Sequence, residues 1–157
     1  MVNGHAAGAA FLVMISASAA AQTDDILFNG TVGEECTVVA DTDGTLSLNG
    51  LATVLSSTEA GGGAGAATVT TNSSSFSVSI DTISAFTSGP ADADTNTVFA
   101  TTYGATGATT ASGVSGDTAT SLGLGSTSLS VDASATKSSG TFSAGSYVLT
   151  ATVRCTA

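Results

Sequence analysis

The segment Tyr147-Val-Leu-Thr-Ala-Thr-Val-Arg-Cys155 places an apolar residue at every second position. Successive side chains of a β-strand point to opposite faces of its sheet, so residues two apart share a face. Five residues share such a face here: Tyr147, Leu149, Ala151, Val153 and Cys155. The period of two therefore predicts a half-buried β-strand at this end of the chain.

The same period recurs along the rest of the chain. In residues 75–83, Phe76, Val78 and Ile80 line one face. Shorter stretches rich in Thr and Val, and bounded by Gly, Asn or Asp, are predicted as further strands: 45–48, 66–71, 97–103, 121–124 and 126–132. No stretch shows the 3.6-residue period of an amphipathic helix. Many short strands without helices predict an all-β fold, an antiparallel Ig-like β-sandwich.

Residues 25–32 repeat this alternation near the other end of the chain. Four alternate residues share one face of this segment: Ile26, Phe28, Gly30 and Val32. We predict another half-buried strand here. It either pairs within its own domain or completes an open sheet edge of a neighbouring molecule, since an extended terminal strand can do both.

Glycine-rich stretches predict the turns and loops. Asp41-Thr-Asp43-Gly44 is typical of a hairpin turn, because Asp-Gly favours the positive φ that tight hairpins need. Residues 61–65 and 104–116 are predicted to be surface loops.

The composition excludes several classes of function. Of 157 residues, 2 are Lys or Arg and 12 are Asp or Glu, which gives a net charge of −10. The only histidine is His5, which lies in a predicted leader. A mature chain without imidazole or a basic patch has no Ser-His-Asp triad, no His-ligated zinc and no nucleic-acid footprint. We expect neither enzymatic activity nor a cofactor, and the length fits one domain.

Residues 1–21 resemble a signal peptide. The apolar run Phe11-Leu-Val-Met-Ile15 lies in an uncharged, Ala-rich stretch that ends in Ala19-Ala-Ala21, an A-x-A cleavage site. The stretch is shorter than the ~20 residues that span a bilayer, and the alternative is a buried helix or membrane anchor. No basic region precedes it, which favours a start codon upstream. We expect a secreted mature chain that starts at Gln22 and does not span the membrane.

Two cysteines, Cys36 and Cys155, are predicted to form one disulfide, because an exported chain meets oxidising conditions. The alternatives are two free buried thiols or a bridge between molecules. If the strand parity of Ile26 continues without interruption, Cys36 faces the core, as Cys155 does in the last strand. Glu34 would then face the core too, so we predict a β-bulge near Gly33.

Two acidic motifs invite a chemical interpretation. Asp92-Ala-Asp94-Thr-Asn96 matches the start of a calcium loop, but Thr97 replaces the glycine and Tyr103 stands where a bidentate Glu belongs. We therefore predict a solvated loop without metal. Glu34 and Glu35 are adjacent and would point to opposite faces of a strand, so they would not converge on one substrate bond.

Motifs at the two ends of the chain resemble a known family. Ile26-Leu-Phe-Asn-Gly-Thr-Val32 is followed by Glu35-Cys-Thr-Val38 and Leu46-Ser-Leu48, and the chain closes with Ala144-Gly-Ser-Tyr-Val-Leu-Thr-Ala-Thr-Val153. These motifs resemble chaperone-usher pilins, the major fimbrial subunits, particularly the archaic, spore-coat-U-like branch. The second cysteine of that family lies partway along the chain, near residues 76–80, whereas here it is Cys155.

The resemblance implies an Ig-like sandwich that lacks its last strand and is completed by donor-strand exchange. The sandwich would be residues 35–157 and the donor extension residues 22–34. The implied donor side chains are Ile26, Phe28, Gly30 and Val32. Implied partners are copies of the chain or related pilins, a periplasmic chaperone and an outer-membrane usher, and the subunit would pass through the periplasm to the cell surface. The alternative function is a self-contained secreted Ig-like domain with a binding role.

Overall fold

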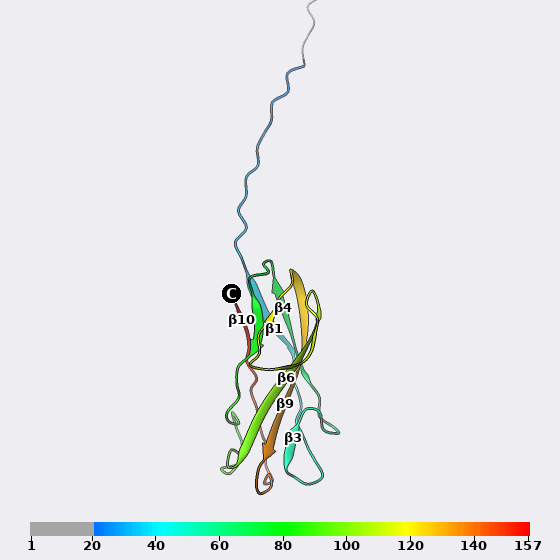
Figure 1. The fold of residues 1–157 in the computed structure, drawn as a ribbon, viewed down its shortest axis with the longest axis vertical. Helices are drawn as coiled ribbons and strands as arrows, with labels where there is room; N and C mark the ends of the chain where they lie inside the picture. Colours follow the sequence, from blue (N-terminus) through cyan, green and yellow to red (C-terminus); the bar gives the residue numbers. More distant parts are fainter. Residues whose placement is uncertain (1–20) are drawn as a thin grey trace, which may run out of the picture. The chain divides into compact units, whose positions relative to one another are not determined.

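Ten β-strands in two antiparallel sheets form the regular structure of residues 21–157, which the computed structural model describes (Figure 1). The larger sheet contains β1 (Cys36–Thr42), β2 (Ser47–Leu48), β3 (Val54–Ser56), β4 (Gly65–Thr71), β6 (Thr97–Gly107), β7 (Ala111–Ser115) and β9 (Gly125–Lys137). The smaller sheet contains β5 (Ser77–Ile80), β8 (Thr120–Ser121) and β10 (Val153–Thr156). No helix occurs in residues 21–157, and the predicted all-β, antiparallel fold class is confirmed. Residues 1–20 of the predicted signal peptide lie outside the described residues.

Strand β9 organises the larger sheet. Thr127, Leu129 and Val131 are buried on one face, and the serines between them are exposed, as a half-buried strand requires. β6 pairs with one edge of β9 along its length. β4 and then β3 pair with the other edge, and β1 continues the sheet beyond β4.

The two sheets pack face to face through a shared apolar core, which is consistent with a β-sandwich. Val78 and Ile80 of the smaller sheet contact Val69 and Leu129 of the larger one. Tyr103 of β6 is also buried there, and its hydroxyl lies 3.1 Å from the Val78 carbonyl oxygen, to which it donates a hydrogen bond. A buried tyrosine needs such a partner for its hydroxyl, so this bond links the two sheets as well as satisfying the side chain.

A second core lies at the other end of the sandwich and is mainly aromatic. Phe86 contacts the rings of Phe99, Phe142 and Tyr147, with centroid separations of 5.1 to 6.0 Å. The edge-to-face and tilted arrangements are those that aromatic quadrupoles favour. This cluster holds the first part of the C-terminal segment, which includes Phe142 and Tyr147, against the sandwich.

Most of the predicted strands are present. In residues 75–83, Val78 and Ile80 are buried and Phe76 is partly buried, as the alternation predicts. In residues 147–155 the predicted apolar face is partly buried and the residues between are exposed. Within that last segment, however, regular strand structure is limited to β10.

The strand predicted at residues 25–32 is not formed in a single copy of the chain. The chain divides into two units between Val32 and Gly33. Residues 21–32 contain no strand, and the side chains of Ile26, Phe28 and Val32 are at least 80% exposed. The prediction of a half-buried strand is therefore wrong for the isolated chain, because no strand is paired with this segment. We call residues 33–157 the body.

Three further predictions, of a loop, a hairpin turn and a β-bulge, are also wrong. Residues 104–116 are not a loose loop, because β6 extends to Gly107 and forms a hairpin with β7. Asp41 to Gly44 do not join two paired strands, since β1 pairs with β4 and β2 pairs with β3. Instead, a Cβ on Gly44 would lie 2.9 Å from the Gly65 nitrogen, so a close backbone approach requires glycine here. The irregularity of β1 lies between Ala40 and Thr42, not near Gly33.

Candidate functional site

A groove of about 700 Å³ opens on the body between the first and last parts of its chain. Its floor is the inner face of the larger sheet, with Leu55 from β3, Ala67 from β4 and Val131 from β9. These three side chains are nearly buried although they line the groove. The volume falls in the range of ~300–1,000 Å³ that is usual for ligand-binding pockets.

Strand β1 forms one wall of the groove. Its residues Ala40 and Thr42 line the cavity, and every residue from Thr37 to Thr42 is exposed. A strand at the surface of a sandwich normally buries one face, so exposure on both faces shows that the inner face of β1 is uncovered. β1 pairs only with β4 among the described residues, which leaves its other edge open.

The C-terminal segment forms the opposite wall, through Tyr147, Leu149, Ala151 and Val153. Its backbone hydrogen bonds go to the side away from the groove, where Val148 bonds to Ser88 and the Thr152 carbonyl accepts from Asp81. Along an extended strand, alternate residues direct their N–H and C=O groups to opposite sides. The backbone groups of Leu149 and Ala151 therefore face the groove and β1.

The predicted disulfide joins these two walls. Cys36 at the start of β1 is bonded to Cys155 in β10, and their Cα atoms are 6.5 Å apart. Figure 1 shows β10 beside β1 near the C-terminus. Both cysteines pack against the core that the two sheets share, as the strand parity predicts. Neither cysteine lines the cavity, which begins at Ala40 on one wall and Val153 on the other and extends to Gly44 and Gly145. The bridge thus joins the two walls just beyond this end of the groove.

An ion pair holds the C-terminal wall to the smaller sheet. The Arg154 guanidinium donates two hydrogen bonds to the Asp81 carboxylate, at 2.7 and 2.5 Å. The hydrogen bond from Arg154, with its positive charge, lowers the pKa of Asp81 below its ordinary value. A carboxylate whose folded pKa is depressed stabilises the fold above its unfolded pKa, near ~3.9, and this stabilisation is lost as the pH falls through the folded pKa.

This linkage gives a prediction for acid unfolding. Between pH 5 and pH 3 (about one unit on either side of the unfolded pKa), the thermal midpoint of the wild-type chain should fall more than that of Asp81→Asn. Arg154→Gln should lose the same part of the pH dependence, because it removes the donor. Both effects are modest, since the pair is exposed. Calorimetric scans across this pH range measure them, and midpoints that run parallel in all three proteins would contradict the assignment.

The acidic loop at residues 92–96 is held by a lysine. The Lys137 ammonium donates hydrogen bonds to the carbonyl oxygens of Asp92, Ala93 and Thr95, at 2.8, 3.0 and 2.8 Å. The Asp94 carboxylate accepts from the backbone N–H of Phe86. A hydrogen bond from Ser143 lowers the pKa of Asp92. In residues 21–157 no group of three or more His, Cys, Asp or Glu side chains could hold a metal ion.

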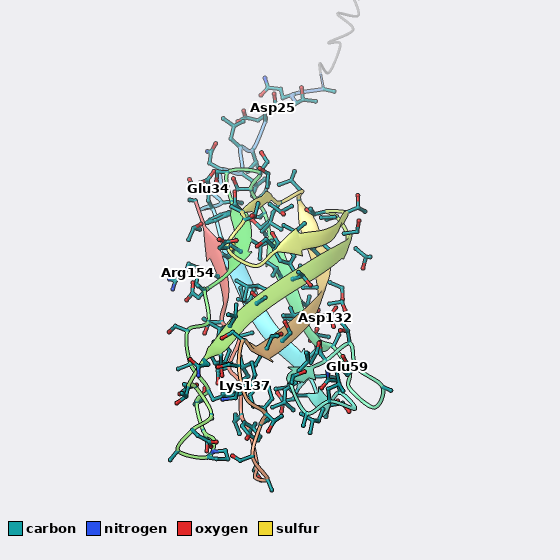
Figure 2. The ribbon with its side chains drawn as sticks, turned by 60° about the horizontal axis from the view of Figure 1, so that its bottom comes forward. Asp25, Glu34, Glu59, Asp132, Lys137 and Arg154 are labelled. Carbon is teal, nitrogen blue, oxygen red and sulfur yellow. A yellow bond between two sulfur atoms is a disulfide. The ribbon has the colours of Figure 1, made fainter. Side chains whose placement is uncertain are left out.

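The four predicted donor residues, Ile26, Phe28, Gly30 and Val32, lie in the N-terminal unit and are exposed there. Glu34 lies at one end of the body (Figure 2), where the hydroxyls of Ser73 and Ser75 donate to its carboxylate at 2.7 and 3.1 Å. The resemblance implied an open groove but not which residues line it, because the alternation of β1 shows which face is apolar but not whether another strand covers it.

No family model, curated protein or solved structure matches this chain. Residues 21–157 contain no helix that is long and apolar enough to cross a membrane.

Proposed function

We propose that this chain is a structural subunit of a surface pilus or fimbria, in which residues 26–32 of one copy enter the groove of the next. In this proposal the body is an Ig-like sandwich that lacks one strand, and the entering segment supplies it. The observation that carries the proposal is the groove of about 700 Å³ between two strand edges that face each other without pairing.

The segment at residues 26–32 has the properties that the groove requires. Open edges are satisfied by an extended segment whose backbone pairs with both and whose alternate side chains fill the cavity. Ile26, Phe28 and Val32 would supply these side chains, and they are exposed in the single copy. At Gly30 an added Cβ would meet nothing within 4 Å in its own chain, so no contact within one copy requires glycine at this position. A close approach inside another copy would explain it.

The exposed apolar segment, the apolar groove and the negative net charge of the chain favour assembly with dedicated protein partners. A segment and a groove that are both apolar would associate nonspecifically before assembly, so we propose a periplasmic chaperone that shields them and an outer-membrane usher that delivers the subunit to the cell surface. The net charge of −10 disfavours nucleic acid and anionic membranes as partners. The proposed role is structural and requires no catalytic step.

Deletion of residues 22–32 tests the proposal. The shortened chain should no longer polymerise, because it lacks the inserted strand, and it should bind a fluorescent peptide of residues 22–32 in its open groove. The full chain should form filaments that electron microscopy detects. Fluorescence anisotropy measures peptide binding, and a peptide with Phe28→Asp is the matched control.

Two results would count against this function. One is a shortened chain that is a protease-resistant monomer and ignores the peptide. The other is a full chain that stays monomeric at every concentration with its groove accessible. Either result would favour the self-contained secreted domain.

A further inference from the structure

If residues 26–32 fill a groove, the groove of the same copy and the grooves of other copies compete to bind this segment. A segment joined by a short flexible linker has an effective concentration of roughly millimolar or more. Residues 33 and 34 have the length of a common two-residue hairpin loop, and Gly33 suits a turn with positive φ. Unless something prevents it, insertion into the same copy would therefore exceed insertion into a neighbour.

The disulfide excludes a strand from the end of the groove next to this linker. Neighbouring strands in a sheet lie about 4.8 Å apart, so two strands that flank a third are separated by about 9.5 Å. The Cα atoms of Cys36 and Cys155 are only 6.5 Å apart. No strand fits between the walls at this point. A tight hairpin that placed Val32 beside Glu35 would run directly into the bridge.

A second set of contacts holds the linker itself. The Asn72 side chain accepts a hydrogen bond from the Glu35 N–H and donates one to the Gly33 carbonyl, both at 2.7 Å. Its backbone N–H also donates to the Glu35 carbonyl, at 3.2 Å. The amide group of Asn72 thus extends the pairing of β1 with β4 by imitating one more strand residue. The Ser73 and Ser75 hydroxyls hold Glu34 beside it. We call Asn72, Ser73 and Ser75 the linker clamp.

The clamp opposes the hairpin that self-insertion requires. A turn at Gly33 and Glu34 that brought the preceding residues back along the open edge of β1 would take the Gly33 carbonyl away from Asn72. It would also take Glu34 away from both serines. The bonds of Asn72 lie on the β4 side of β1, opposite to the open edge of β1. The clamp therefore fixes the linker in a path that continues β1.

We infer that the disulfide and the linker clamp together close the groove to the chain's own residues 26–32, so that it accepts this segment only from another copy. This inference rests on the proposed function. It names the structural features that favour assembly over self-insertion. The segment of another copy has no such restriction, because it is not tied to Cys36 and can approach the part of the groove lined by Gly44 and Gly145, away from the bridge.

The test is a full chain in which the linker can bypass the bridge. About six Gly and Ser residues inserted between Val32 and Gly33 would span roughly 13 Å, and Asn72→Ala would release the linker. The disulfide stays intact in this variant, so the fold is preserved. We expect its monomer fraction at low micromolar concentration to rise at least about tenfold over wild type, with the groove filled and unable to bind the peptide of residues 22–32.

The matched control carries the same insertion and Asn72→Ala together with Phe28→Asp. Its own segment cannot fill a groove, so it should be a monomer that still binds the peptide. A second variant, Cys36→Ala/Cys155→Ala, opens the closed end directly and should also increase self-insertion if size and circular dichroism show that it is folded.

Two results would overturn the inference: a long-linker variant that polymerises and binds peptide as wild type does, or an oxidised wild-type chain that is a monomer with its groove already filled. Failure of the proposed function is distinguishable from both. In that case the control with Phe28→Asp, whose groove is empty, would not bind the peptide either.

Discussion

The variant Cys36→Ala/Cys155→Ala should unfold with a free energy about 4 to 5 kcal/mol lower than that of the oxidised chain. The two cysteines are 119 residues apart, so the bridge closes a long loop in the unfolded chain and lowers its conformational entropy. Domains of this size are stable by about 5 to 15 kcal/mol, so the loss is a large share of the total. Urea unfolding followed by circular dichroism measures the difference, provided that both transitions are two-state.

The position of the bridge makes this loss specific to the groove. Within residues 21–157, β1 pairs only with β4 and β10 only with β5, so without the disulfide no strand pairing in this part of the chain joins the two walls. Reduction of the wild-type chain is the matched control, and it should lower the free energy of unfolding by the same amount. A loss below about 1 kcal/mol in both experiments would show that packing around the groove, and not the covalent bond, holds the walls together.

The half-buried strands were predictable because their side chains alternate against a core. Val78 and Ile80 are large, β-branched and two apart, so the period of two is visible in the sequence and the burial follows from it. The disulfide was predictable from the two cysteines of a chain that is expected to be exported, and the inward orientation of Cys155 from its place on the apolar face of Leu149 and Val153. At these positions the residues that give the period of two in the sequence are also the ones that pack against the core.

Other elements were missed because their sequence does not carry that pattern. The β6–β7 hairpin consists largely of Gly, Ala, Ser and Thr, which resemble a loop in composition. Its turn residue Gly107 has φ +106°, and a Cβ there would lie 2.7 Å from the Ser126 carbonyl oxygen. This glycine thus permits a close approach between strands. Composition alone cannot distinguish it from the glycine of a flexible loop.

The resemblance to pilins implies an open groove, but the local pattern of the strands does not show where it lies. Val38 and Ala40 have the alternation of a strand that faces a core, yet both are exposed. Whether a face is covered depends on the strand order, which local pattern does not determine. The same limit applied to Glu34. Its parity pointed toward the core and favoured a bulge, whereas the structure places its carboxylate on two serine hydroxyls of the β4–β5 loop.

Phe28→Asp should abolish filament formation. If Phe28 enters the groove as proposed, the substitution would place a carboxylate over an apolar floor, and the one charged lining residue within residues 21–157, Asp43, has the same sign. An ionised group that is buried without a partner costs at least several kcal/mol, and about 2.7 kcal/mol already corresponds to a hundredfold loss of affinity. The critical concentration for assembly should therefore rise at least about a hundredfold, as sedimentation of filaments measures.

Asn29→Asp is the matched control, because it adds the same charge one residue away on the opposite face of the entering strand. If the period of two governs entry, Asn29→Asp should assemble nearly as wild type does. Net charge alone would weaken both variants equally, and added salt would restore both, since exposed charges are screened. Equal loss in the two variants, reversed by salt, would mean that repulsion between acidic copies limits assembly and that Phe28 does not enter the groove.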